Sequence, residues 1–204
     1  MIGRSWFCLL LTAPVFFCGC NSETANEKVS EKVEEPAPQT IAVELQTSMG
    51  DIVVELNEQA APVTVKNFLR YVEDGFYDGT IFHRVIHKFM IQGGGLTPEM
   101  EKKETRDAIV NEASNGLKNK RGAIAMARGE NPNSATCQFF INHAANPGLD
   151  YVAGQNPGYA VFGKVVEGMD VVDAIAFVET TTRAGRENVP VEPVIIESAK
   201  VVSR

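Results

Sequence analysis

The sequence predicts a mainly β domain that carries two helices. Between residues 41 and 204, eight short runs rich in β-branched and aromatic residues are separated by turn residues, whereas only two stretches show helical periodicity. This portion numbers 164 residues, and the whole chain is 44% hydrophobic and 22% charged, which suits one globular domain with a proper core. Many short strands favour a closed barrel, because closure removes exposed strand edges, but the pattern alone does not distinguish a barrel from a sandwich.

The first expected elements are a hairpin and a helix. Residues 41–47 and 51–56 are β-rich runs with partial alternation, and a short turn containing Gly50 joins them. The helix is expected to begin at Pro62, which suits a first helical turn, and to end near Gly75, which can adopt a left-handed conformation. Its apolar residues recur at helical spacing and predict one face packed on the sheet: Val65, Phe68, Leu69, Val72 and Phe76.

The rest of the domain is expected to consist of short strands, one more helix and long loops. The segment 93–122 is too rich in charge and glycine to be core, and we interpret it as ordered loops that flank a site. The further strands are expected at residues 81–86, 90–92, 123–127, 139–142, 161–166 and 194–201, and the second helix at 169–176.

The N-terminus has the pattern of a secretory signal. Arg4 precedes an uncharged apolar run at residues 6–17, which is shorter than the ~20 residues of a permanent membrane span. The junction that follows resembles a bacterial lipobox, in which cleavage precedes a cysteine that is then lipidated. Gly19 fits the position before that cysteine, whereas Phe17 stands where the pattern prefers Leu. We therefore expect a lipoprotein-type signal peptide at 1–19 and lipidation of Cys20; the alternative is ordinary secretion, with Cys20 as a free thiol.

Residues 20–40 are expected to form a tether behind the lipidated cysteine. The stretch 21–40 has five Glu, two Lys, two Pro and little apolar content, so it cannot bury enough surface to offset the entropy of ordering. The predicted location is the cell envelope, anchored by lipid on the periplasmic side, and Asn21 after the cysteine resembles lipoproteins sent to an outer membrane. The alternative is a soluble periplasmic or secreted protein. The net charge of −7 argues against nucleic acid as a partner.

Three clusters of residues in the domain point to one site. Residues 82–86 place Arg84 amid apolar side chains, and residues 89–94 follow with Gln92 and a Gly-rich turn. Residues 138–142 add two aromatic side chains, and residues 159–165 add another strand-like run. The clusters indicate an apolar pocket with one permanent cation in it.

In this order, the three clusters resemble the cyclophilins, the peptidyl-prolyl cis-trans isomerases, and the resemblance extends from about Ala42 to Val201. It implies a closed eight-stranded antiparallel β-barrel capped by two α-helices. It also implies that residues 41–204 form an isomerase domain, which would rotate X–Pro bonds in proteins outside the cytoplasm and assist their folding.

The chemistry of this reaction explains why one arginine matters. An X–Pro bond has partial double-bond character and a rotation barrier of ~18–20 kcal/mol. Catalysis needs no nucleophile, metal or cofactor, only a site that binds the twisted amide better than either planar isomer. Arg84 is the candidate catalytic residue, because a cationic donor aimed at the prolyl nitrogen stabilises its lone pair. The resemblance implies that Gln92 holds Arg84 and binds a substrate carbonyl, and that His83 borders the site.

The resemblance also implies the substrate contacts. Ala127 and Arg128 match the family segment whose backbone binds the substrate peptide, although many relatives carry Asn at the second position. Gly148 stands where relatives carry Trp or Phe, so we expect weak binding of the family's cyclic peptide inhibitor, cyclosporin. The expected partners are proline-containing polypeptides, and we expect a monomer. The predicted substrate-binding residues are Phe82, Phe89, Met90, Ala127, Arg128, Gln138, Phe140, Leu149 and Tyr159.

Other functions fit the sequence less well. His83 and His87 would lie ~13 Å apart in an extended strand, too far to share a metal ion. A thiol hydrolase built on Cys137 and His143 would need them to meet across ~20 Å of strand. The remaining alternative is a catalytically idle cyclophilin domain that binds proline segments as a chaperone or assembly module, but such a binder has no need of Arg84.

Overall fold

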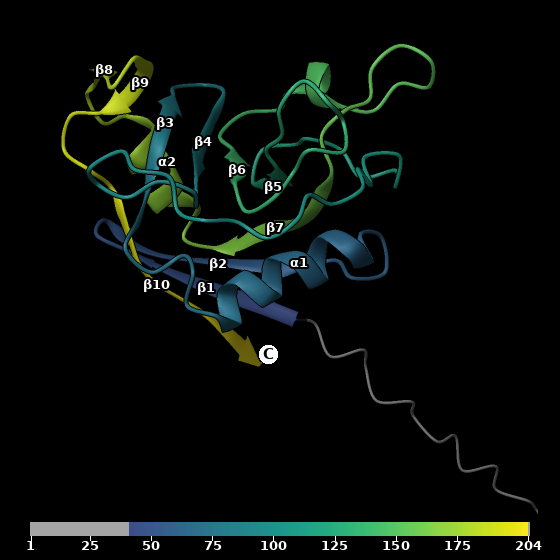
Figure 1. Cartoon of the computed structure of the whole chain (residues 1–204), viewed down its shortest axis with the longest axis horizontal. Helices are drawn as coiled ribbons and strands as arrows, with labels where there is room; N and C mark the ends of the chain where they lie inside the picture. The colour runs from purple at the N-terminus through teal and green to yellow at the C-terminus, as the bar shows by residue number, and fades with distance from the viewer. Residues whose placement is uncertain (1–40, 204) are drawn as a thin grey trace, which may run out of the picture. The chain divides into compact units, whose positions relative to one another are not determined.

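The computed structural model describes residues 41–203, which fold as a barrel with two α-helices (Figure 1). The elements, in chain order, are β1 (Ile41–Thr47), β2 (Gly50–Leu56), α1 (Pro62–Glu73), β3 (Thr80–Ile86), β4 (Met90–Gly93), β5 (Ala123–Met126), β6 (Phe139–Asn142), the 3₁₀ helix η1 (Pro147–Leu149), β7 (Val161–Glu167), α2 (Met169–Ala176), β8 (Thr180–Arg183), β9 (Arg186–Pro190) and β10 (Ile195–Ser203).

Eight strands close into one antiparallel barrel. Their order around it is β1-β10-β3-β4-β6-β5-β7-β2, and β1 completes the ring by pairing with both β10 and β2. The predicted barrel and all eight of its strands are confirmed, with ends that differ by at most a few residues. Sequence reasoning missed the separate hairpin of β8 and β9, because its residues are mostly polar and exposed and show no apolar alternation.

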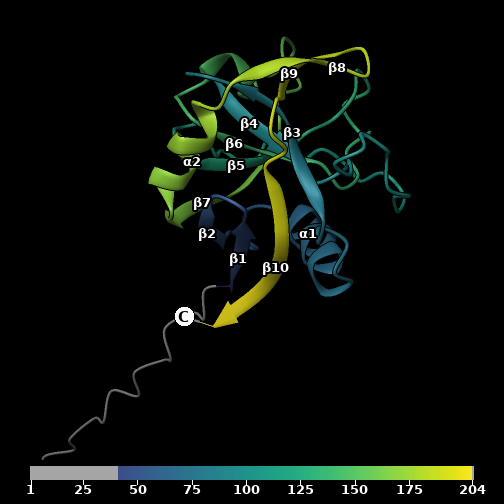
Figure 2. The ribbon, with the colours of Figure 1, turned by 90° about the vertical axis from the view of Figure 1, so that its left-hand side faces the viewer.

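The two helices lie on opposite sides of the barrel (Figure 2) and supply side chains to the same core. α1 contributes Val65 and Phe68, and α2 contributes Val172 and Ile175. The first turn of α1 has no side-chain cap from the residue before Pro62.

A loop residue far along the chain caps α1. Glu112 accepts hydrogen bonds from the backbone N–H groups of Val63 and Thr64 at 3.1 and 2.7 Å, and from the Thr64 hydroxyl at 2.7 Å. A carboxylate at this end also complements the helix dipole. The contact fixes the long segment between β4 and β5 against the barrel.

That long segment is not purely loop surface. Leu96 is fully buried, so the expectation that residues 93–122 stay out of the core is wrong at this position. The backbone carbonyl of Leu96 accepts a hydrogen bond from the N–H of Ile81 in β3 at 2.9 Å, which holds this position against the barrel. The segment therefore contacts β3, the strand that carries Arg84.

The predicted signal peptide, Cys20 and the tether of residues 20–40 lie outside the described residues. Between residues 41 and 203, no helix has the length and apolar character needed to cross a membrane.

Candidate active site

Nine side chains line one small pocket on the outside of the barrel, with a volume of about 130 Å³. They come from β3, β4 and β6 and from the segments that follow β5 and precede β7. The sequence had singled out every one of them. The lining residues are Arg84, Phe89, Met90, Gln92, Ala127, Arg128, Phe140, Leu149 and Tyr159.

A β-bulge in β3 turns Arg84 toward this pocket. Along β3 one residue, His83, lies between Phe82 and Arg84, but their partners on β4 are adjacent, so His83 is the extra residue. Phe82 and Val85 both lie in the barrel core, whereas regular alternation would put Phe82 and Arg84 on the same face. The bulge therefore lets a core aromatic and a pocket arginine stand two positions apart.

A short chain of side-chain hydrogen bonds orients the arginine. Arg84 Nη1 donates to Gln92 Oε1 at 3.4 Å, and Gln92 Nε2 donates to Gln138 Oε1 at 3.1 Å. The guanidinium carbon also lies 5.9 Å from the centre of the Phe89 ring, within cation–π range. Gln92 occupies one of the five guanidinium N–H groups, which leaves donors for a ligand in the pocket.

The opposite wall is apolar. Met90 and Phe140 belong to a buried cluster distinct from the barrel core, and Phe89, Leu149 and Tyr159 pack against it. The rings of Phe140 and Tyr159 meet edge to face, with 5.6 Å between their centres. The pocket thus joins a small apolar surface, suited to one small ring, to a fixed positive charge.

Arg128 is held differently from Arg84. Its Nε donates to the carbonyl of Gly158 at 3.0 Å, its Nη1 donates to the carbonyl of Gly129 at 2.9 Å, and its guanidinium carbon lies 4.3 Å from the centre of the Tyr159 ring. These contacts make Arg128 a brace for the pocket wall. Of the two pocket arginines, Arg84 has the less engaged guanidinium.

Comparison with known proteins identifies the family. The family profile described as "Cyclophilin type peptidyl-prolyl cis-trans isomerase/CLD" matches residues 42–201. This chain belongs to the cyclophilin family.

Among its relatives, peptidyl-prolyl cis-trans isomerase cyp18 of Streptomyces antibioticus is 58% identical over 163 residues, covering 78% of this chain and 98% of the relative. Peptidyl-prolyl cis-trans isomerase B of Escherichia coli is 54% identical over 161 residues, covering 78% and 98%. The crystal structure of a Cryptosporidium parvum cyclophilin type peptidyl-prolyl cis-trans isomerase, in the presence of the dipeptide Ala-Pro, has a TM-score of 0.69 and 30% identity, covering 80% of this chain and 99% of that one.

Three residues predicted for the site of this cyclophilin do not line its pocket. Gln138 lies behind Gln92 and supports it, as described above. Phe82 is fully buried in the barrel core, so the structure contradicts its assignment to substrate contact. His83, which was expected to border the site, is only 3% exposed and lies outside the pocket lining. Both assignments came from the family resemblance, and alternation in the sequence does not reveal the bulge that buries these two side chains.

His83 is a buried, neutral side chain. Burial, and then the positive charge of Arg186, lower the pKa of His83 from 6.5 to about 4, although a hydrogen bond to the Ile81 backbone opposes the shift. Its Nδ1 atom is buried without a hydrogen-bond partner. A ring with this pKa carries no charge near neutral pH, so Arg84 keeps the only permanent charge of the 82–86 motif.

The thiol-hydrolase alternative finds no support in this cyclophilin. Cys137 is buried, and burial raises the pKa of its thiol, which disfavours the nucleophilic thiolate. His143 is engaged elsewhere: its Nδ1 accepts the backbone N–H of Lys88 at 2.9 Å, and its Nε2 lies 3.2 Å from Asp173.

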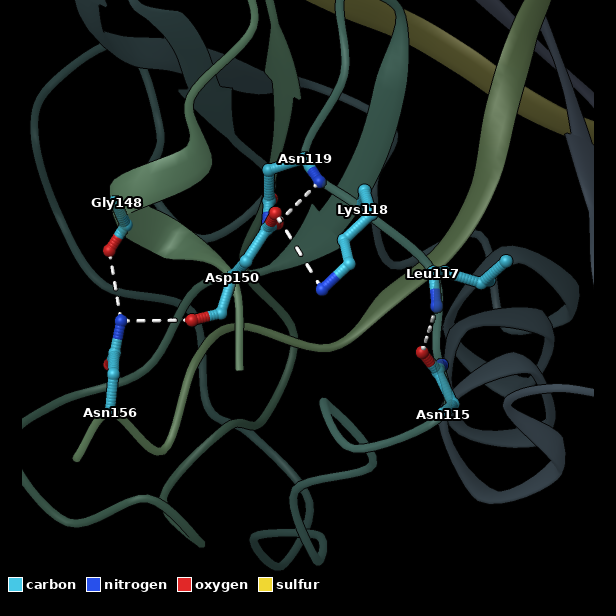
Figure 3. Close-up of polar contacts among 7 residues, drawn as sticks. All are labelled: Asn115, Leu117, Lys118, Asn119, Gly148, Asp150 and Asn156. Atoms are coloured by element: carbon cyan, nitrogen blue, oxygen red, sulfur yellow. Dashed lines mark hydrogen bonds and ion pairs between the residues drawn. The ribbon is translucent and has the colours of Figure 1, made fainter. Parts of the chain in front are cut away.

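Sequence reasoning missed a polar network that holds the Leu149 side of the pocket (Figure 3). Asp150 Oδ1 accepts hydrogen bonds from the backbone and side-chain nitrogens of Asn119 at 2.8 and 3.0 Å. Asn156 donates to the carbonyls of Gly148 and Asp150, both at 2.9 Å. The one available signal was the number of Asn residues around Asp150, since Asn and Asp side chains commonly bond to nearby backbone.

The buried ring of His83 predicts a pH-dependent stability. Because the folded-state pKa is depressed, its stabilising contribution is complete above the unfolded value of about 6.5 and is lost as pH falls toward 4. Between pH 7 and 4.5 this loss amounts to about 2 kcal/mol. His83→Gln cannot titrate, so urea unfolding should show a smaller loss in this variant by about that amount. The exposed His87→Gln serves as the control and should behave like wild type; equal losses in all three proteins would contradict the prediction.

Proposed function

We propose that this cyclophilin catalyses cis–trans rotation of X–Pro bonds in polypeptides. The carrying observation is the pocket itself, in which Arg84 faces a small apolar wall while Gln92 and Gln138 hold its guanidinium. Membership in a family of peptidyl-prolyl cis-trans isomerases and relatives of that name at 54–58% identity support the activity.

The geometry suggests how the barrier falls. The prolyl ring packs into the pocket against Met90, Phe140 and Leu149, which fixes the proline side of the X–Pro bond. As the amide twists, resonance is lost and the prolyl nitrogen regains a lone pair, to which Arg84 donates a hydrogen bond. Gln92 keeps the guanidinium in place, so that little reorganisation is needed at the moment of rotation.

Arg84→Ala should lower kcat/KM by roughly 10²–10³-fold, as expected when one oriented transition-state donor is deleted. The thermal midpoint should stay near that of wild type, because the side chain is half-exposed and faces the pocket. Arg84→Lys should restore activity only in part, since an ammonium lacks the planar fork. A proline-isomerisation assay on a short peptide measures both variants, with exposed Arg70→Ala of α1 as the control.

The same assay tests the rest of the mechanism. The rate should be nearly flat between about pH 6 and 8, because the pKa of His83 is about 4 and no general base takes part. A folded Arg84→Ala variant that keeps most of its activity would remove Arg84 from the mechanism. A wild-type protein that binds proline peptides without isomerising them would instead support the binding-module alternative.

We propose further that the enzyme is a bacterial lipoprotein that works outside the cytoplasm and assists protein folding there. The matched family region begins at residue 42, so residues 1–41 are an addition to it. That addition has a signal-like apolar run, a lipobox-like junction at Cys20 and an acidic tether. The relatives at 54–58% identity are bacterial, whereas a fungal relative from Gibberella zeae is 36% identical.

Cys20→Ser should release the protein from the membrane fraction of a bacterial host. A single short acyl chain holds a protein only marginally, so stable anchoring requires more than one chain on this cysteine. Cell fractionation and labelling with a fatty acid measure the effect, with Cys18→Ser as the control that should stay membrane-bound and labelled. Wild type found already in the soluble fraction would refute lipidation.

The rim position Gly148 predicts weak cyclosporin binding. Gly148 is exposed, a Cβ built there meets no atom within 4 Å, and its φ is not in the left-handed region, so a larger side chain fits without strain. Gly148→Trp should tighten cyclosporin binding by ~1–3 kcal/mol, about what burying one large apolar side chain supplies, while isomerase activity is largely kept. Titration with the inhibitor measures it.

A matched variant separates the rim position from its neighbour. Tyr151 is partly exposed on the same loop, and it could take the place of the missing ring. If the assignment of Gly148 is right, Tyr151→Ala leaves the weak binding of wild type unchanged. Tight binding by wild type would show that the rim position was assigned wrongly.

A further inference from the structure

A second cavity, of about 390 Å³, lies on the barrel wall beside β2, β5 and β7 and the segment that precedes β5. We call it the basic groove. Its apolar lining comes from Leu117, Ala123, Val161 and Gly163, and its cationic lining from Lys118, Lys120, Arg121 and Lys164. Glu55 and Asn57 complete the polar part of the lining.

The groove is positive on a chain whose net charge is −7. Arg121 is engaged with Asp173 at 2.7 Å, so its charge is already paired. The side chains of Lys118 and Lys164 are 50% and 64% exposed, and Lys120 is exposed too. Among the residues that line the groove, Glu55 is the single carboxylate against these three lysines, which leaves an excess of positive charge.

The contacts of the lysines are loose enough to be exchanged. Lys118 lies 3.9 Å from Asp150, whose other oxygen already accepts two hydrogen bonds from Asn119. Lys164 lies 3.1 Å from Glu55 across neighbouring strands at the surface. In both pairs the lysine end is exposed to solvent, and ion pairs with an exposed partner contribute little free energy, so a ligand carboxylate can compete for these lysines.

The groove and the active-site pocket are built on the same buried apolar cluster. Ala123 and Val161 of the groove belong to the same buried cluster as Met90 and Phe140 of the pocket, and Leu117 and Leu149 pack against that cluster from the two sides.

The ridge between the two cavities is narrow. Figure 3 shows Asp150, which follows the pocket residue Leu149, bonded to Asn119, two residues beyond the groove residue Leu117. Counting ~3.8 Å for each step along the chain, the two cavities lie at most about 20 Å apart. An extended peptide covers that distance in about six residues.

We propose that the basic groove binds an acidic stretch of the polypeptide substrate, within about six residues of the proline that occupies the pocket. Carboxylates of that stretch pair with Lys118, Lys120 and Lys164, while an intervening apolar side chain packs on Leu117 and Val161. Lysine on a flexible stem tolerates variable spacing of the carboxylates, so the groove selects for charge rather than for one sequence. The proposal rests on the proposed isomerase function for the role of the neighbouring pocket.

The test compares two series of peptides with the same central X–Pro sequence. One series carries two Glu residues four to six positions before or after the proline, and the other carries Gln at the same positions. At low salt, the full-length wild type should show a KM about three- to tenfold lower for the acidic peptides that carry Glu on one side of the proline than for the matching Gln peptides, with unchanged kcat. The preference should vanish at ~1 M salt, where screening acts over ~3 Å.

The triple variant Lys118→Gln, Lys120→Gln, Lys164→Gln should lose this preference and keep wild-type kinetics on the Gln peptides. The control is the double variant Lys66→Gln, Arg70→Gln on the exposed face of α1, which removes two cations elsewhere and should keep the preference. A preference that survives in the triple variant, or that is lost equally in the control, overturns the proposal. An equal loss of activity of the triple variant on the Glu and Gln peptides also overturns it, because the lysines would then act only by supporting the pocket.

Binding alone separates this proposal from the isomerase assignment. A fluorescent Glu-rich peptide without proline should bind wild type more tightly than the triple variant, whether or not the protein isomerises proline. Equal binding overturns the groove even if the enzyme is active. The competing occupant of the groove is the chain's own acidic segment at 21–40. If changing its five Glu residues to Gln tightens binding of the peptide, this segment occupies the groove, and the proposal that the groove binds substrate is overturned.

Discussion

The β-bulge at His83 is the constraint on which the active site depends. A closed barrel of eight strands fills its interior with side chains, so a functional residue has to point outward. Without the bulge, Arg84 would share the inner face with Phe82, and a permanent charge would enter the core at a large cost in desolvation. The bulge also needs a close approach of the partner strand: a Cβ on Gly93 would lie 2.9 Å from the Ile81 carbonyl oxygen. His83 occupies the extra position as a buried neutral ring, which satisfies the packing without adding a charge beside Arg84.

The outward side chains of the central strands form the second cluster, and both cavities stand on it. On β6, Phe139 and Ile141 point into the core while Phe140 points out, so one short strand serves both sides of the wall. Loops then build the cavity rims on this cluster, and each is fixed by a polar contact rather than by its own apolar content. Glu112 fixes the segment before β5 by capping α1, and Asp150 fixes the turn that carries Leu149. Carboxylates that do no chemistry therefore help to fix the loops around the two cavities.

The sequence was informative wherever local pattern determines structure. Alternation and turn residues located all eight barrel strands, and the resemblance supplied their closure, which pattern had left open. The β8–β9 hairpin was missed because strands of exposed Thr and Arg lack an apolar face. Phe82 and His83 were assigned to the site from the family resemblance, and local alternation does not reveal the bulge that buries both side chains. The contact between Glu112 and α1 spans 48 residues of chain, and no local signal in one sequence predicts a pairing of that range.

The two pocket arginines show why the position of a charge matters more than its presence. Arg128 makes two hydrogen bonds to backbone carbonyls and a cation–π contact with the Tyr159 ring, so its guanidinium holds the pocket wall in place. Arg84 has one side-chain hydrogen bond, to Gln92, and this contact orients the guanidinium without exhausting its donors. A donor held in advance loses little entropy when the prolyl nitrogen becomes basic, whereas a free arginine would have to be ordered at each turnover. The relay from Gln138 through Gln92 thus prepares this half-buried arginine for the catalytic role that we propose for it.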